Sequence, residues 1–156
     1  MAILTLHHWS DPLTGLREMR RVARAQVVVM TFDLDRLERF WLLTDYLPEA
    51  LADDRKRFPT IEQVRAAVGD ARVEEVGVPS DCRDGFFEAY YARPEAYLDP
   101  GVRAAQSAWP RLPAGVEERA ISALKADLES GRWDQRHGRL RSLAVYEAAL
   151  RLVVAG

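Results

Sequence analysis

The first twelve residues combine a short apolar run, a polar and aromatic turn and a helix start, and they restrict the fold more than any other stretch. Residues 2–6 are apolar apart from one threonine, which predicts a short buried strand. The run His7-His8-Trp9 follows where that strand should end. Asp11 suits a helix N-cap, and Pro12 suits the first helical position because its missing N–H needs no partner there. The segment is therefore predicted to be a strand, a loop and a helix.

A second strand is predicted after this helix, which should cover residues 12–24 because its apolar side chains recur near the 3.6-residue period. Residues 26–32 are mostly β-branched and apolar, which is typical of a strand buried on both faces of a parallel sheet. Strand, helix and strand then form a right-handed crossover. Ligands of open α/β sheets bind outside the carboxyl ends of the strands. We therefore expect the loop 7–9 and Asp33, just past the second strand, at the ligand edge.

The segment after Asp33 is predicted to be one helix followed by a connector. Residues 35–47 carry large apolar side chains at helical spacing. Pro48 should end this helix, since proline cannot continue one. Residues 53–57 are all charged and are expected to form a connector.

A clear local signature comes next. Thr60 and Gln63 have the spacing of a capping box, and Gly69 is placed to terminate the helix over residues 61–68. Alternating valines then predict a strand over 71–78, which a proline stops.

The segment 80–146 contains no convincing strand and is punctuated by prolines. Its expected helical segments are residues 84–92, 94–98, 100–109 and 114–130. Residues 149–155 form a closing apolar strand interrupted by Arg151. We therefore interpret 80–146 as a helical cap inserted before the last strand.

Composition excludes several classes of function. A chain of 156 residues suits one domain with a core, and a net charge of −2 gives no basic field for nucleic acid or anionic lipid. Cys82 is the sole cysteine, so no intrachain disulfide can form and a reducing cytoplasm is expected. No apolar run approaches the roughly 18 residues that span a bilayer. The first apolar run lacks the preceding basic region of a signal peptide. We therefore expect a cytoplasmic protein without nucleic-acid or membrane partners.

The chain resembles a known enzyme family in three places: residues 4–12, the helix containing 16–22, and the strand 27–33. The pattern is similar to class I S-adenosyl-L-methionine (SAM)-dependent methyltransferases of the methyltransferase-11, UbiE-like kind. In that family it forms the fourth strand, fourth helix and fifth strand. The resemblance covers nearly the whole chain but only the C-terminal half of the family. The first three strands and the Gly-rich turn after strand one have no counterpart, so an incomplete or inactive chain is expected. Met1 would then be an internal start of a longer gene product.

The resemblance implies an α/β fold with a partial Rossmann-like methyltransferase sheet, mostly parallel, whose last strand is antiparallel. The implied strand order is 2–6, 26–32, 149–155 and 71–78. Residues 1–79 and 147–156 then form the core domain, and residues 80–146 form the helical cap.

The resemblance also implies that S-adenosyl-L-methionine is the cofactor. Leu6, His7, His8 and Trp9 would then form a wall of its site, beside the adenine or methionine portion. The alternative is that the two histidines only cap or pack near the tryptophan. No metal is expected, because neighbouring histidines of an extended segment point to opposite faces and His137 is the only other one.

A second stretch, beginning at residue 81, resembles a segment found in a subgroup of these methyltransferases. The alternatives are that Asp84 caps a helix and that Tyr90 packs with its hydroxyl outward. Nothing near Cys82 suggests an activated thiol. The residues interpreted as contacts to a small-molecule methyl acceptor are Trp41, Asp81, Cys82, Asp84, Phe86 and Tyr90.

Methyl transfer from a sulfonium depends mainly on positioning, and a base is needed only if the acceptor must lose a proton. The reaction therefore requires no fixed catalytic signature. His8 and Asp81 are the candidate catalytic residues, because each is expected on the ligand edge.

A different class of function is also open. The strand 2–6 would be an apolar sheet edge without a neighbour, which is an aggregation hazard unless something covers it. The chain could therefore be a non-catalytic, methyltransferase-like interaction module. Its partner would be a second chain or a second copy in a homodimer.

Overall fold

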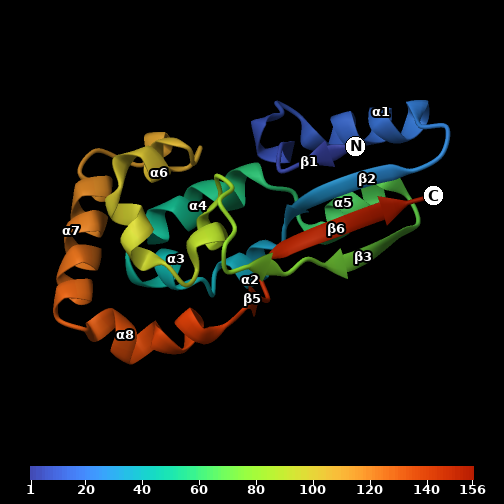
Figure 1. Cartoon of the computed structure of the whole chain (residues 1–156). Coiled ribbons are helices and arrows are strands. Elements are labelled where there is room, and N and C mark those ends of the chain that lie inside the picture. The colour runs from blue at the N-terminus through green and yellow to red at the C-terminus, as the bar shows by residue number, and fades with distance from the viewer. The chain divides into compact units, whose positions relative to one another are not determined.

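The computed structural model describes all residues, 1–156, and divides into two compact units. The first unit comprises Met1–Leu37, Asp53–Val76 and Ala148–Gly156, and the second comprises Glu38–Ala52 and Gly77–Glu147 (Figure 1). The second unit thus holds residues 38–52 as well as the segment predicted to be the cap. None of the helices combines the length and apolar character needed to cross a bilayer.

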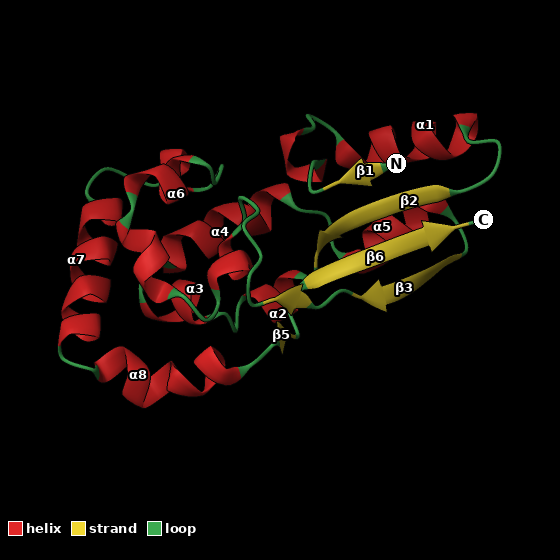
Figure 2. Ribbon diagram, in the orientation of Figure 1, coloured by secondary structure: helices red, strands yellow, loops and turns green.

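The first unit is built on a four-stranded sheet (Figure 2). The strand order is β1 (Ala2–Ile3), β2 (Val27–Phe32), β6 (Leu150–Ala155) and β3 (Ala71–Glu75). Strand β1 is parallel to β2, whereas β6 is antiparallel to both β2 and β3. The predicted order and the antiparallel last strand are confirmed. The carboxyl ends of β1, β2 and β3 consequently face one edge of the sheet.

Helices α1 (Pro12–Val22) and α5 (Ile61–Val68) cover one face of this sheet. The start of α1 is capped as predicted, because the Asp11 carboxylate accepts the Thr14 N–H at 3.0 Å. The capping box at the start of α5 is confirmed as well. The core between helices and sheet contains Leu6, Leu16, Val27, Val29, Val64, Val68, Val153 and Ala155.

A charged side chain lies inside the sheet. Arg151 in β6 is 6% exposed, and its Nη1 donates to the carbonyls of Ala148 at 3.0 Å and Leu150 at 2.8 Å. Its Nη2 lies 3.5 Å from Asp33 Oδ2 and 3.4 Å from Glu75 Oε1. Arg151 therefore ties the carboxyl ends of β2 and β3 to the strand between them.

The first strand is shorter than predicted. The Leu4 N–H still bonds to the Met30 carbonyl at 3.0 Å, but Leu4 has a φ of +50°. This left-handed backbone, unusual for a leucine, turns the chain out of the ladder. The prediction of strand beyond Ile3 is therefore wrong, and the chain continues as the 3₁₀ turn η1 (Leu6–His8).

The helix predicted over 35–47 is interrupted. It is replaced by α2 (Leu34–Leu37) and α3 (Trp41–Asp45), with Phe40 in an extended conformation between them. Pro48 begins α4 (Pro48–Arg57) rather than ending a helix, because a proline at the first helical position has no N–H to satisfy. The predicted connector 53–57 is therefore the end of α4.

The predicted strand 71–78 is also divided. Strand β3 ends at Glu75, and β4 (Val78–Pro79) pairs instead with β5 (Val145–Tyr146) in a separate two-stranded sheet of the second unit. The prediction that residues 80–146 contain no strand is wrong for β5. Two-residue strands are too short to produce a visible alternation.

The rest of the second unit is helical, as predicted, but much of it is 3₁₀ helix. The long helix is α7 (Val116–Glu129), and α8 (Arg132–His137), absent from the predictions, follows it. The other elements are η2 (Phe87–Tyr90), η3 (Pro94–Leu98), α6 (Pro100–Ala104), η4 (Trp109–Arg111) and η5 (Gly138–Ser142).

Replacing Arg151 by methionine should lower the free energy of unfolding by about 2 kcal/mol, since charged hydrogen bonds inside the sheet are lost. Urea unfolding followed by circular dichroism measures the change. The matched control is Arg72→Met in β3, whose side chain is 64% exposed beside Glu74. That substitution should change stability by less than about 0.5 kcal/mol. Equal losses in the two variants would contradict the anchoring role of Arg151.

Candidate functional site

An open groove of about 780 Å³ lies in the first unit, beside the loop that follows β1. Its volume is in the range of small-molecule sites. The groove is lined by residues 7–13, from the loop to the first turn of α1, by residues 55–59 at the end of α4, and by Gln63 of α5. Two parts of the chain that are distant in sequence therefore build one concave surface.

The loop at one side of the groove is a tight 3₁₀ turn. The His8 N–H bonds to the Thr5 carbonyl at 2.9 Å, and the Trp9 N–H bonds to the Leu6 carbonyl at 3.1 Å. Leu6 is 1% exposed and lies in the core beneath the turn. The turn therefore has a fixed backbone, and its histidine and tryptophan side chains line the groove.

The two histidine rings lie together instead of pointing to opposite faces. Their centroids are 4.0 Å apart, because the segment is a 3₁₀ turn and not the extended chain that was assumed. The His7 ring also stacks on Phe58, with centroids 4.6 Å apart and 25° between the planes. No group of three or more histidine, cysteine or acidic side chains could hold a metal ion anywhere in the chain.

Trp9 is held by close packing on α1. A Cβ atom added at Gly15 would lie 2.5 Å from Trp9 Cε3, which is shorter than any real carbon contact. The indole therefore packs directly against the helix at Gly15, and only glycine leaves room for it. This contact explains a glycine in the middle of a helix, where alanine would otherwise be preferred.

Arg57 connects the end of α4 to the loop. Its Nη2 donates to the His7 carbonyl at 2.5 Å, and its Nε is buried without a hydrogen-bond partner. The neighbouring Arg55 and Lys56 also line the groove, whereas Asp11 supplies its only carboxylate. The backbone hydrogen bond from Thr14 holds the pKa of Asp11 below its ordinary value. The groove thus carries an excess of positive charge.

The run Arg55-Lys56-Arg57 was missed as a functional signal because it was interpreted as a connector. Three consecutive cations before an aromatic residue and a proline are visible in the sequence. Their position beside the loop 7–9 depends on α4 and could not be derived from local pattern.

The predicted residues near position 81 belong to the second unit. The Cys82 N–H bonds to the Pro79 carbonyl at 3.0 Å, and the Cys82 carbonyl accepts Arg93 Nη2. Asp84 accepts the Gly85 N–H at 2.7 Å, and no helix begins there. Asp81 is exposed and Phe86 is half-buried. Their contact with an acceptor remains a prediction.

Trp41 and Tyr90 are core residues of the second unit. Trp41 is 3% exposed, and its Nε1 donates to the Tyr91 carbonyl at 3.0 Å. Its ring makes edge contacts with Tyr97 and Trp133. The Tyr90 ring meets Tyr97 edge-on and carries the Arg93 guanidinium at 4.9 Å. A substrate role for Trp41 and Tyr90 therefore also remains a prediction.

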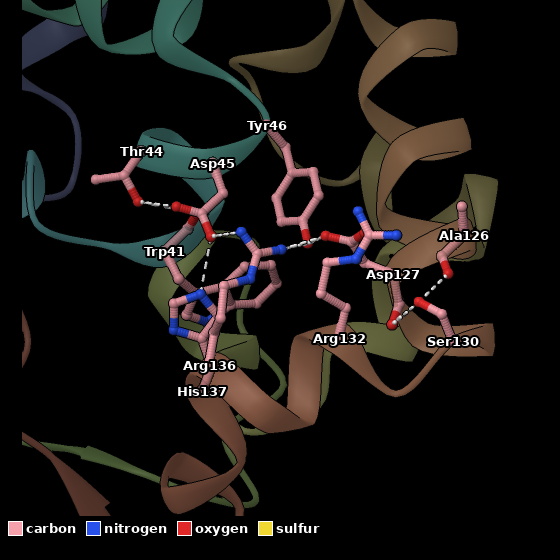
Figure 3. Close-up of polar contacts among 10 residues, drawn as sticks. All are labelled: Trp41, Thr44, Asp45, Tyr46, Ala126, Asp127, Ser130, Arg132, Arg136 and His137. Carbon is pink, nitrogen blue, oxygen red and sulfur yellow. Dashed lines mark hydrogen bonds and ion pairs between the residues drawn. The ribbon is translucent and has the colours of Figure 1, made fainter.

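A polar network joins α3, α7 and α8 in this unit (Figure 3). Arg136 lies between two carboxylates, contacting Asp127 and lying 3.1 Å from Asp45. Tyr46 donates to Asp127 at 2.8 Å, and His137 Nε2 lies 2.8 Å from Asp45. The network therefore fixes the end of α3 to both helices.

The network shifts the ionisation of two members. Burial, and then the hydrogen bond to Asp127, raise the pKa of Tyr46 far above its ordinary value. Partial burial acts to raise the pKa of Asp45, but hydrogen bonds from His137 and Thr44 and the charge of Arg136 outweigh it. The pKa of Asp45 is therefore lower than the ordinary 3.8.

Comparison with solved structures supports a methyltransferase-like fold. Among solved structures, the chain is similar to a proposed methyltransferase from an antibiotic biosynthesis pathway of Anabaena variabilis, with a TM-score of 0.87 and 29% sequence identity. The match covers 99% of this chain and 64% of that protein, so the chain spans less than two thirds of it. The sequence matches no protein-family model, and no curated protein is significantly similar to it. The predicted methyltransferase-like α/β fold is confirmed.

Replacing Gly15 by alanine should displace the Trp9 indole from α1. The Trp9 indole N–H signal in a ¹H–¹⁵N NMR spectrum should shift, while stability falls by about 1 kcal/mol despite the better helix propensity of alanine. Gly138→Ala is the control, because its added Cβ would meet Asp134 at an ordinary 3.5 Å. An unshifted Trp9 signal in Gly15→Ala would show that the contact does not position the ring.

Replacing Asp45 by asparagine should weaken the second unit in a pH-dependent way. Because the folded pKa of Asp45 is lowered, its ionised form adds stability above the unfolded pKa, and this stability is lost as the pH falls through the folded pKa. The variant should be about 1 kcal/mol less stable at roughly pH 5 and above, and equal to wild type near roughly pH 2. Thermal unfolding at several pH values measures this.

Glu129→Gln is the control for that series, since Glu129 is 67% exposed beside Lys125 at 3.9 Å. It should change stability by less than about 0.5 kcal/mol. A constant difference between Asp45→Asn and wild type at every pH would contradict the prediction.

Proposed function

We propose that this chain is the C-terminal portion of a SAM-dependent methyltransferase that transfers a methyl group to a small-molecule acceptor. The observation that supports this most is the similarity to the Anabaena variabilis protein over 99% of the chain. The groove beside the carboxyl end of β1 is where open α/β sheets bind ligands.

The residues of the loop suit one wall of a cofactor site. Leu6 lies in the core beneath the loop, and His7, His8 and Trp9 line the groove with ring surfaces and few competing charges. The chemistry that S-adenosyl-L-methionine supplies when bound is an electrophilic methyl group on a sulfonium. The role of the loop is to shape this wall and to exclude water from it. Positioning of the reactants accounts for most of the rate of a methyl transfer by displacement at the sulfonium.

His8 is the better placed of the two proposed catalytic residues. It is exposed, lines the groove and lies beside the His7 ring. A neutral imidazole there could take a proton from an acceptor hydroxyl or amine. Asp81 is an exposed carboxylate of the second unit and is kept as the alternative base.

The chain alone offers no Gly-rich turn and no carboxylate beyond Asp11 at the groove. Strand β1 pairs only with β2, and Ile3 is 45% exposed. We therefore propose that further strands join the open edge of β1 and complete the cofactor site. They would come from a longer form of the protein or from a partner chain.

Calorimetric titration with S-adenosylhomocysteine tests the proposal. The chain alone should bind with a dissociation constant above about 1 mM. A form extended by the upstream reading frame should bind at about 10 μM. Micromolar binding by the chain alone would contradict the need for further strands. Absence of binding by the extended form would contradict the methyltransferase proposal.

The second candidate function is a non-catalytic interaction module, supported by the same exposed edge. Met1 is 83% exposed and Ile3 is 45% exposed, so apolar surface remains at β1. Such a module should form a homodimer or a complex with a partner chain and have no affinity for the cofactor. Sedimentation analysis of the purified chain separates the candidates, because a strict monomer up to about 100 μM would argue against a homodimer.

A further inference from the structure

We propose that the groove of the first unit binds an anionic, flat ligand: a carboxylate or phosphate attached to a ring, with Lys56 as its main charged contact. This names the substrate class of the methyl acceptor and rests on the proposed function for that role. The binding itself follows from the groove and is testable without methyl transfer.

The charge of the groove favours an anion. Its lining contains Arg55, Lys56 and Arg57 against the single carboxylate of Asp11, in a chain whose net charge is −2. The Asp11 carboxylate is already occupied by the start of α1. The local charge therefore differs in sign from that of the whole protein, which is the arrangement that concentrates anions in a concave site.

Lys56 is the cation left for a ligand. Arg57 already donates to the His7 carbonyl, and Arg55 has other interactions within the chain. Lys56 is exposed and forms no hydrogen bond or ion pair. Its ammonium can therefore meet a carboxylate or phosphate without breaking an existing contact.

The helix ends add to the same potential. Helix α1 has eleven residues and α5 has eight, and the first turn of each reaches the groove through Pro12 and Gln63. The N-terminus of a helix carries a partial positive charge that favours anions. The buried Nε of Arg57, which lacks a partner, adds a further unsatisfied donor in the wall.

The shape of the wall favours a ring. The His7 ring stacks on Phe58 with centroids 4.6 Å apart, and the His8 ring lies 4.0 Å from His7 at a tilt of 45°. The Trp9 ring packs against α1 at Gly15. Aromatic surfaces of this kind hold planar ligands by offset stacking. A ring bearing an anionic group would use the aromatic wall and Lys56 together.

The same charges make this part of the groove unsuitable for a sulfonium. A positive sulfur beside Arg55 and Lys56 would be repelled, since like charges in a cleft raise each other's energy. We therefore assign residues 55–58 to the anionic group of the acceptor, whose ring would lie against His8 and Trp9, next to the part of the loop 6–9 that the cofactor would use.

The test is a titration of the full chain, followed through the imidazole and indole NMR signals. The probes are benzoate, phenyl phosphate, uncharged benzamide and inorganic phosphate. Benzoate or phenyl phosphate should shift the His8 and Trp9 signals with millimolar affinity, and the tighter of the two identifies the anionic group. Benzamide and inorganic phosphate should bind at least about fivefold more weakly, because each lacks one of the two contacts.

Lys56→Gln should weaken benzoate binding about three- to fivefold, whereas Lys125→Gln should not change it. The comparison is matched, since Lys56 and Lys125 are the only lysines of the chain and Lys125 lies in the second unit. Raising the salt concentration should weaken benzoate binding to wild type, which gives a second readout that needs no variant.

Equal binding of benzoate and benzamide, or equal loss in both lysine variants, would overturn the proposal. So would anion binding that leaves the His8 and Trp9 signals unshifted. The two proposals fail separately. If the extended form binds S-adenosylhomocysteine but the chain does not bind benzoate, only the proposal of an anionic acceptor is contradicted. If the chain binds benzoate but the extended form does not bind S-adenosylhomocysteine, only the methyltransferase proposal is contradicted.

Discussion

Arg151 is the interaction on which the geometry of the first unit depends. It places a guanidinium in the antiparallel strand β6 and pairs it with Asp33 after β2 and Glu75 at the end of β3. The ends of β2, β6 and β3 are thereby held at one edge, although β6 is antiparallel to both of its neighbours. A parallel arrangement at that edge is what gives loops such as 7–9 a common side of the sheet.

The groove beside that edge depends on small local contacts. Gly15 admits the Trp9 ring, Arg57 holds the His7 carbonyl, and Phe58 stacks on the His7 imidazole. Each contact joins two segments of the first unit and gives the wall its shape. Lys56 takes part in none of these contacts, so its charge can be changed without loss of the fold.

The features that the sequence could predict are those set by neighbouring residues. The capping box of Thr60 and Gln63 is confirmed because both partners lie within one turn. Pro48 was misassigned, since a proline is equally compatible with a helix start and with a stop. Strands β4 and β5 could not be predicted because each has two residues and depends on a partner more than sixty positions away. Residues 55–57 at the end of α4 line the groove because the helix ends beside the loop 7–9. No local sequence pattern encodes that tertiary position.

The central claim is that the groove at His7, His8 and Trp9 is where the ligand binds. Chemical modification of the histidines by diethyl pyrocarbonate, read by mass spectrometry with and without saturating benzoate, tests it directly. The internal reference is His137, which belongs to the second unit. Benzoate should slow modification of His8 several-fold and leave the rate at His137 unchanged. Equal rates at His8 with and without benzoate would contradict it.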